Sequence, residues 1–333
     1  MIVSILYLVC APFANGLNIA ITGSSQGIGL AAARKLVAEG HNVFHACRSE
    51  ERAEVAQVRA GGGIPMLSDL ADLDSVRLFA QSLKRSAPVL DVLCLNAAVA
   101  PSTKAKIAPR TMDGFEEAMG VNHIGHFLLA SLMQPHLAAC GGANRLVVTA
   151  SSVHDPEQPG GAVGGSGGAT LGDLSGFGCK EGEAAVMPDG ATEYDGGKVY
   201  KDSKLANMLF CREAQKRWGS SGLAVRSFNP GFIPASGLFR APRANNWLGA
   251  TAFTIIAGAA GFAVPIEVGG DRLAFMATAS DAEVPPGSYL SGPTGSKGFS
   301  RADGFGDGLI SPEASDGTLA ATLWEKTAKL VDV

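Results

Sequence analysis

The sequence predicts an α/β fold in which helices cover both faces of a doubly wound parallel sheet. Apolar runs of strand length alternate with longer helical segments through residues 17–228. Such alternation implies right-handed crossovers between parallel strands. A glycine-rich turn at 23–29, between the first strand and the first helix, supports the same arrangement. Ligands of such sheets bind beyond the carboxyl ends of the strands, so functional residues are expected there.

The predicted elements follow one another with few interruptions. Short apolar runs bounded by turn residues predict strands at 17–22, 42–47, 64–67, 90–95, 145–149 and 224–228. The longer stretches between them predict helices at 30–39, about 50–60, 74–85, 115–137 and 198–218. Gly40 follows the first helix, where a glycine favours termination. The pattern indicates a single domain over residues 17–333.

Two stretches depart from this alternation. Residues 156–197 are glycine-rich and aperiodic, which indicates a long insertion that is either functional or disordered. Residues 247–266 carry no charge, and their length would suit a membrane span. Their glycine, alanine and threonine content makes them only weakly apolar, so a helical flap over the substrate pocket is favoured. We place this flap within a substrate flap and tail at 236–333 and expect it to allow peripheral membrane contact.

Composition excludes several classes of protein. The chain has 333 residues, of which 46% are apolar and 17% charged, enough to bury a large core. Its net charge of −4 does not suit a nucleic-acid-binding protein, which needs a broad basic surface. The six cysteines form no CxxC pair, so we expect no metal site and no disulfide scaffold, and a reducing compartment such as the cytoplasm is favoured.

Residues 1–16 stand apart from the predicted domain. Residues 1–14 are apolar and uncharged, as in the central part of a targeting segment, but they lack its basic start. They are too short to span a bilayer comfortably. We interpret the segment as either a targeting remnant or an apolar extension.

The glycine-rich turn has the composition of a phosphate cradle. Glycines permit a tight turn and let backbone N–H groups approach a pyrophosphate, and the helix that follows offers its positive end. The position of the turn between a strand and a helix indicates a Rossmann-type dinucleotide-binding fold. The candidate cofactor residues here are Gly23, Ser24, Ser25, Gln26, Gly27, Ile28 and Gly29.

Arg48 follows the second strand, where NAD-binding proteins carry an acidic residue for the ribose 2′-hydroxyl. A guanidinium binds a 2′-phosphate bidentately, so NADPH is favoured over NADH. A solvated surface arginine is the alternative interpretation. Further cofactor contacts are expected from Asp69 and Leu70 at the adenine and from Asn96, Ala97 and Ala98 at the ribose.

Tyr200 and Lys204 lie four residues apart on a predicted helix and therefore share one face. A nearby ammonium favours the phenolate, so Lys204 is expected to lower the pKa of Tyr200 and make it a proton donor or acceptor near neutral pH. Lys204 can also bind the nicotinamide ribose. Ser151, after the fifth strand, is expected to hold the substrate oxygen or orient the phenol, and Asn122 to anchor a water in a proton relay.

These motifs, in this order, resemble those of the short-chain dehydrogenases/reductases. The matching segments are TGSSQGIG at 22–29, NAA at 96–98, Asn122, Ser151 and YKDSK at 200–204. The resemblance implies an Asn–Ser–Tyr–Lys tetrad made of Asn122, Ser151, Tyr200 and Lys204. It also assigns Pro230, Gly231 and Ile233, after the sixth strand, to the cofactor site.

A narrower resemblance is to the light-dependent protochlorophyllide oxidoreductases of the same family. It is carried by LNAAVAPSTKAK, VNHIGHFLLASL, EYDGGKVYKDSKLANML, PGFIPASGLFR and the C-terminal SPEASDGTLAATLWEKTAKLV. The insertion at 156–197 and the C-terminal tail are absent from generic family members. The resemblance implies light-driven addition of a hydride from NADPH and a proton to the C17–C18 double bond of protochlorophyllide, giving chlorophyllide. It also implies a plastid location.

The chain departs from that branch after the sixth strand. The branch usually has Tyr-Pro-Gly-Cys, whereas this chain has Asn229, Pro230, Gly231 and Phe232. A phenylalanine cannot supply a proton, although it can stack on a flat macrocycle. Phe232 and Phe239 are the candidate substrate contacts.

Three functions stay open at this point. The first is a protochlorophyllide oxidoreductase acting on a tetrapyrrole pigment. The second is an NADPH-dependent carbonyl or retinol-type reductase that works in darkness, with Tyr200 protonating the developing alkoxide and Ser151 stabilising it. The third is a non-catalytic protein that binds NADPH or pigment, which the changes at Asn229 and Phe232 would allow. A small-molecule substrate is common to the two enzymes, and self-association is open in all three.

Overall fold

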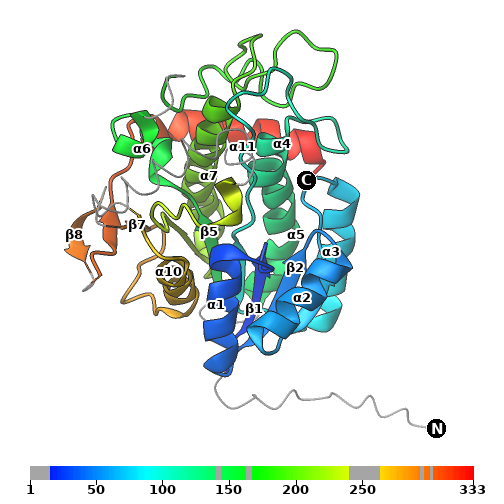
Figure 1. Ribbon diagram of the computed structural model, residues 1–333, viewed down its shortest axis with the longest axis vertical. Coiled ribbons are helices and arrows are strands. Elements are labelled where there is room, and N and C mark those ends of the chain that lie inside the picture. Colours follow the sequence, from blue (N-terminus) through cyan, green and yellow to red (C-terminus); the bar gives the residue numbers. More distant parts are fainter. Residues whose placement is uncertain (1–15, 140–143, 163–166, 240–262, 293–295, 301–302) are drawn as a thin grey trace.

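A computed structural model describes residues 16–139, 144–162, 167–239, 263–292, 296–300 and 303–333. A nine-stranded sheet crosses the molecule in the order β3-β2-β1-β4-β5-β6-β7-β9-β8 (Figure 1). Its strands are β1 (Asn18–Thr22), β2 (Asn42–Cys47), β3 (Ile64–Leu67), β4 (Val92–Leu95), β5 (Arg145–Thr149), β6 (Ala224–Phe228), β7 (Tyr289–Ser291), β8 (Ser296–Ser300) and β9 (Gly306–Gly308). The predicted doubly wound α/β fold is confirmed.

Helices cover both faces of this sheet. They are α1 (Gly27–Ala38), α2 (Glu50–Ala60), α3 (Leu73–Ser86), α4 (Glu117–Met119), α5 (Gly125–Ala139), α6 (Pro159–Ala162), α7 (Gly196–Trp218), α10 (Ile266–Thr278) and α11 (Gly317–Val331). On one face α1 packs against α2 and α10, and on the other α3, α5 and α7 share a large apolar core (Figure 1). The C-terminal α11 lies against α5 and α7. Strands β1, β4, β5 and β6 are almost entirely buried between these layers.

Three features differ from the expectations. The sheet is parallel only as far as β7, because β9 and β8 add to its edge as antiparallel strands. The predicted helix 115–137 begins at Glu117 and is interrupted by a π-helical turn at Gly120–Ile124. Helix α10 belongs to the segment 236–333 that was expected to form the substrate flap and tail. It packs closely on α1 instead and so helps to cover the sheet. Residues 1–15 and most of the predicted flap at 247–266 lie outside the described residues.

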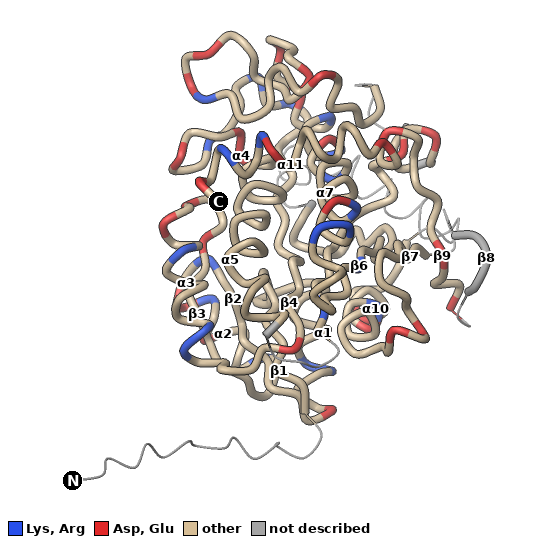
Figure 2. The backbone as a smooth tube through the Cα atoms, turned by 180° about the vertical axis from the view of Figure 1, so that it is seen from behind, with Lys and Arg blue, Asp and Glu red and all other residues tan. Residues whose placement is uncertain are grey.

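The charged residues follow this layering. Figure 2 shows lysines, arginines and acidic residues interspersed along the outer helices and loops, while the central strands carry few of them. Among the described residues, no helix combines the length and apolar character needed to cross a membrane. The apolar strands thus form a rigid platform whose carboxyl ends lie next to the α7 residues predicted to be catalytic.

Candidate active site

The glycine turn follows β1 and is held tightly by backbone contacts. Gly23 has a φ of 70°, a conformation that glycine adopts without strain. A Cβ on Gly29 would lie 2.5 Å from the Gly23 carbonyl oxygen and 2.7 Å from Nδ2 of Asn96. That Nδ2 donates a hydrogen bond of 2.9 Å to the Thr22 carbonyl. Asn96, predicted to flank the ribose, therefore also fixes the turn.

Behind the turn lies a buried polar chain that the sequence did not reveal. The Thr22 hydroxyl oxygen accepts from the backbone N–H groups of Asn96 at 2.8 Å and Ala97 at 3.0 Å. His126 contacts this hydroxyl through Nε2 at 2.9 Å and the Asn122 carbonyl through Nδ1 at 3.2 Å. Since a carbonyl only accepts, Nδ1 of His126 carries the proton and Nε2 accepts from Thr22. The four-residue spacing of Asn122 and His126 was the available signal.

Within the turn, Ser24 has a different orientation from its neighbours. Its side chain is buried and its hydroxyl contacts Nδ1 of His45 at 3.1 Å and Sγ of Cys47 at 3.7 Å. Ser24 therefore ties the turn to β2. Burial lowers the pKa of His45, which keeps this imidazole neutral. The remaining turn residues Ser25, Gln26, Gly27 and Ile28 are half-buried.

The segment after β6 lies beside the glycine turn. A Cβ on Gly237 would lie 2.2 Å from Nε2 of Gln26, which places these two residues in direct contact. Gly269 of α10 lies against both Ile28 and Ile233 in the same way. The turn and the residues that follow β6, both expected at the cofactor, thus lie side by side.

Arg48 is exposed at the carboxyl end of β2 and makes no hydrogen bond or salt bridge within the described part of the chain. This placement leaves the guanidinium available for a 2′-phosphate. Nearby, Oδ1 of Asp69 accepts from the Ala71 N–H at 3.0 Å, and Leu70 is buried. Asp69 therefore shapes the loop expected at the adenine, while Ala98 is half-buried at the end of the β4 loop.

We expect Arg48→Ala to weaken NADPH binding by about ten- to hundredfold, because hydrogen bonds to a charged group contribute about 1.5–3 kcal/mol. NADH lacks the 2′-phosphate, so its affinity should change little. Fluorescence titration with both nucleotides measures the two dissociation constants, and Arg52→Ala on the neighbouring helix is the matched control. Equal losses for NADPH and NADH would remove Arg48 from the 2′-phosphate site.

Tyr200 and Lys204 lie on successive turns of α7, on the same face of the helix. Nζ of Lys204 is 5.7 Å from the centre of the Tyr200 ring. Lys204 is buried, and Nζ donates a hydrogen bond of 2.9 Å to the Thr149 carbonyl at the end of β5. The half-buried Tyr200 makes no side-chain hydrogen bond among the described residues, which leaves its hydroxyl available to a substrate.

The predicted effect of Lys204 on the pKa of Tyr200 is wrong for this arrangement. Burial raises the pKa of Tyr200, and the ammonium of Lys204 lies over the phenol ring. Burial also lowers the pKa of Lys204 to about 8. Tyr200 is therefore a neutral phenol at neutral pH and suits the role of proton donor.

The pKa of Lys204 predicts a pH-dependent stability. An ordinary lysine titrates at 10.5, so between about pH 8 and 10.5 the unfolded chain binds more protons than the folded one. Stability contributed by this group must then rise with pH through that window. We expect the free energy of unfolding of the wild type, relative to Lys204→Met, to rise there and to stay constant below it. Denaturant unfolding at several pH values measures the difference, and a flat or falling difference would contradict the expectation.

Asn122 lies in the π-helical turn and is fully engaged by its neighbours. Its Oδ1 accepts from the Val99 N–H at 2.9 Å, and its Nδ2 donates to the Val99 carbonyl and the Ser203 hydroxyl at 3.0 Å each. The amide therefore joins the β4 loop to α7. The expected role of Asn122 in anchoring a water of a proton relay stays a prediction.

Ser151 follows β5 and caps the short helical turn at 152–154. Its hydroxyl accepts from the Val153 N–H at 3.4 Å, and its carbonyl accepts from Nδ1 of the buried His154 at 2.7 Å. Nε2 of His154 accepts in turn from the N–H of Ser311 at 3.4 Å. Ser151 is thus fixed by its own turn and, through His154, by the C-terminal tail. The expected role of Ser151 in holding the substrate oxygen or orienting the Tyr200 phenol stays a prediction.

The residues after β6 explain what Asn229 does. Asn229 is buried, donates through Nδ2 to Ser291 at 3.1 Å and accepts from the Gly231 N–H at 3.2 Å. Asn229 therefore supports the loop from inside. Pro230 is fixed by its carbonyl, which accepts from Arg272 at 2.9 Å. Phe232 is half-buried, and the side chain of Phe239 lies outside the described structure.

Comparisons with known proteins show which family the chain resembles. The family model for short chain dehydrogenases matches residues 17–166. The chloroplastic protochlorophyllide reductase A of Oryza sativa subsp. japonica is 37% identical over 322 residues, covering 94% of this chain and 80% of that protein. The chloroplastic protochlorophyllide reductase of Chlamydomonas reinhardtii is 38% identical over 321 residues, covering 93% and 77% respectively.

Solved structures share the fold. An uncharacterised protein from Mycobacterium paratuberculosis has a TM-score of 0.65 at 26% identity and covers 95% of this chain and 94% of its own. A short chain dehydrogenase/reductase family protein has a TM-score of 0.57 at 25% identity, covering 83% and 95%. The similarity in sequence and in fold extends over nearly the whole chain. The chain therefore belongs to the short-chain dehydrogenase/reductase family, alongside the protochlorophyllide reductases.

Proposed function

We propose that this protein is a plastid NADPH-dependent protochlorophyllide oxidoreductase driven by light. The observation that carries the proposal is the identity of 37% over 94% of the chain to a chloroplastic protochlorophyllide reductase. The insertion at 156–197 and the C-terminal tail lie within that similarity. A generic short-chain reductase would account for the motifs on α7 but not for these two regions.

The site has the features that NADPH requires. The turn around Gly23 and Gly29 leaves no room for larger side chains, and the exposed Arg48 stands where a 2′-phosphate is recognised. When bound, NADPH supplies the hydride of the reduction. Lys204 would bind the nicotinamide ribose with its ammonium, and Ala97 and Asn96 would bound the cradle from the β4 side.

Tyr200 supplies the proton in this proposal. Its hydroxyl is free of protein partners among the described residues, and its raised pKa keeps the proton on the phenol until a base develops on the substrate. The overall reaction consumes protochlorophyllide, NADPH and one proton and yields chlorophyllide and NADP⁺. Phe232 offers an aromatic face and no proton, so proton delivery rests on Tyr200.

A second function is favoured by one observation. Asn229 faces inward and Phe232 has no acidic proton, so the pigment-side groups usual in the protochlorophyllide branch are missing. A carbonyl reductase that works in darkness would need only Tyr200, Lys204 and Ser151. A pigment-binding protein without turnover would fit the same departures.

A flash experiment separates these functions. Purified protein is mixed with NADPH and protochlorophyllide in darkness and then given a single flash. Our proposal predicts that the red absorption band shifts only after the flash and only with NADPH present. Oxidation of NADPH by aldehydes or ketones in darkness, without a flash-induced shift, would favour the carbonyl reductase. Pigment binding without turnover in either assay would refute both enzymes.

A further inference from the structure

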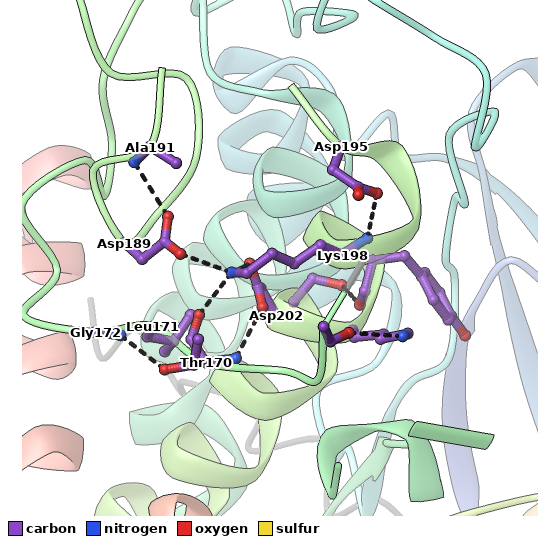
Figure 3. Close-up of polar contacts among 12 residues, drawn as sticks. Thr170, Leu171, Gly172, Asp189, Ala191, Asp195, Lys198 and Asp202 are labelled. Atoms are coloured by element: carbon purple, nitrogen blue, oxygen red, sulfur yellow. Dashed lines mark hydrogen bonds and ion pairs between the residues drawn. The ribbon is translucent and has the colours of Figure 1, made fainter. Parts of the chain in front are cut away.

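The glycine-rich insertion is attached to α7 next to the predicted catalytic tyrosine. Nζ of Lys198 donates to the Thr170 carbonyl at 3.0 Å and to Oδ2 of Asp202 at 2.7 Å, and it lies 3.0 Å from Oδ2 of Asp189. Figure 3 shows the Lys198 side chain reaching between Asp189, Asp202 and Thr170. Thr170 and Asp189 belong to the insertion, whereas Lys198 and Asp202 lie on α7. The four groups form what we call the insertion clamp.

The polar groups of the insertion clamp are engaged by several partners. Oδ1 of Asp202 accepts from the Thr170 N–H at 3.1 Å, so both carboxylate oxygens are engaged. The Asp202 side chain is fully buried, and that of Lys198 is 14% exposed. A second lysine, Lys201, donates to the carbonyls of Gly161 and Gly167 at 2.8 and 3.0 Å. The same short stretch of α7 therefore holds the insertion at several points.

The C-terminal tail closes the arrangement from the other side. Oε1 of Glu313 accepts from the Leu171 N–H at 2.7 Å and from the Thr170 hydroxyl at 3.2 Å. The segment of the insertion around Thr170 thus forms hydrogen bonds both with α7 and with the C-terminal tail. These are the two regions that distinguish the chain from generic members of its family.

The position of the clamp on the helix matters for the chemistry. Lys198 and Asp202 lie two residues before and two residues after Tyr200, so the clamp brackets the turn that carries the phenol. Lys204, on the same face of α7 as Tyr200, is joined to β5 by its hydrogen bond to the Thr149 carbonyl. This stretch of α7 is therefore fixed between the sheet and the insertion. Burying an ion pair contributes little net stability, so such a pair is better explained by the geometry that it fixes.

We propose that Lys198 and Asp202 are positioning residues, which hold the insertion against α7 and thereby set the position of the Tyr200 phenol relative to the substrate. The inference rests on the proposed function for the identity of the proton donor. It assigns a role to Asp202, inside the YKDSK segment, and to Lys198, two residues before that segment, which the catalytic tetrad leaves unexplained.

The test compares Lys198→Met and Asp202→Asn with Lys198→Arg, which restores the charge, and with Lys216→Met. Lys216 lies on the same helix, has an exposed side chain that pairs with the buried Glu213, and serves as the matched control. Asp189→Asn removes only the insertion's half of the ion pair, so it keeps the test available if a substitution on α7 prevents folding.

The first measurement is hydrogen exchange of the cofactor-free proteins, which requires no activity. Lys198→Met, Asp202→Asn and Asp189→Asn should speed exchange in residues 167–191 and in the Tyr200 turn, and Lys216→Met should not. Unchanged exchange in all three clamp variants would refute the clamp. A wild type that fails to reduce the pigment would instead refute the proposed function and leave this comparison intact.

The second measurement is turnover of the substrate that the wild type reduces, per NADPH-binding site. We expect kcat to fall roughly tenfold or more in Lys198→Met and Asp202→Asn, because a small displacement of a catalytic group is costly. Lys198→Arg should recover most of this loss. The solvent deuterium isotope effect should increase as proton transfer becomes slower, whereas a loss of folded protein alone would leave it unchanged. Faster exchange with unaltered kcat and isotope effect would refute the positioning role.

Discussion

Replacing Tyr200 with phenylalanine is expected to lower turnover by roughly 10²–10⁴-fold, the usual contribution of a positioned general acid. The substitution removes one hydroxyl that has no protein partner among the described residues, so the packing of α7 should be unchanged. Lys204 keeps its hydrogen bond to the Thr149 carbonyl in this variant. The affinity for NADPH should therefore stay close to that of the wild type.

Single-flash turnover and NADPH titration measure the two effects separately. Tyr194→Phe is the matched control, because it also removes a phenol hydroxyl, here one that donates to Glu116 at 2.8 Å. We expect that variant to lose some stability and to retain the chemistry. Turnover of Tyr200→Phe at the wild-type rate would show that another group delivers the proton.

Replacing Gly29 with alanine is expected to have the second largest effect. The added Cβ would lie 2.5 Å from the Gly23 carbonyl oxygen and 2.7 Å from Nδ2 of Asn96, both parts of the buried turn. The turn must open to relieve these contacts, which should destabilise the fold by about 1–3 kcal/mol and move the N–H groups of the cradle. NADPH affinity should fall by roughly tenfold or more.

Thermal unfolding and NADPH titration test this expectation, with Gly317→Ala as the control. A Cβ on Gly317, at the start of α11, would approach no closer than 3.7 Å to Arg212. That variant should bind NADPH as the wild type does. Wild-type affinity in Gly29→Ala would mean that the cradle lies elsewhere.

Much of the sheet could be predicted from sequence because its strands are buried on both sides. Strands such as β1 and β5 appear as continuous apolar runs, which is typical of central parallel strands. The outer strands have no such signal. β9 is Gly306–Gly308, a sequence of low strand propensity that pairs only because β7 and β8 lie beside it. The antiparallel edge is therefore a product of tertiary contacts.

The order of the site motifs along the chain could be predicted from sequence, but the directions in which their side chains point could not. Gly23 follows β1, Ser151 follows β5, and Tyr200 lies on the long helix α7 after β5, so the topology alone brings these motifs to one edge of the sheet. Which way a polar side chain points depends on its neighbours. Ser24 and Asn229 both face inward to partners from distant strands. Spacing along the chain carries no information about such contacts.

The pKa of Tyr200 shows the same limit. Helical spacing correctly placed Lys204 near Tyr200, and the distance of 5.7 Å from the ring centre agrees with it. Spacing could not reveal that burial outweighs the ammonium, because burial depends on the whole fold. The insertion clamp was missed for a related reason, since its partners on residues 167–191 lie in a segment without periodicity.

The most direct test of the central claim uses NADPH that carries deuterium at the transferable position. A dark complex with protochlorophyllide is given one flash, and the product is analysed by mass spectrometry. We predict chlorophyllide that contains one deuterium from the cofactor and one proton from the solvent, formed only after illumination. Product without cofactor deuterium, or pigment reduction that proceeds equally in darkness, would contradict the assignment.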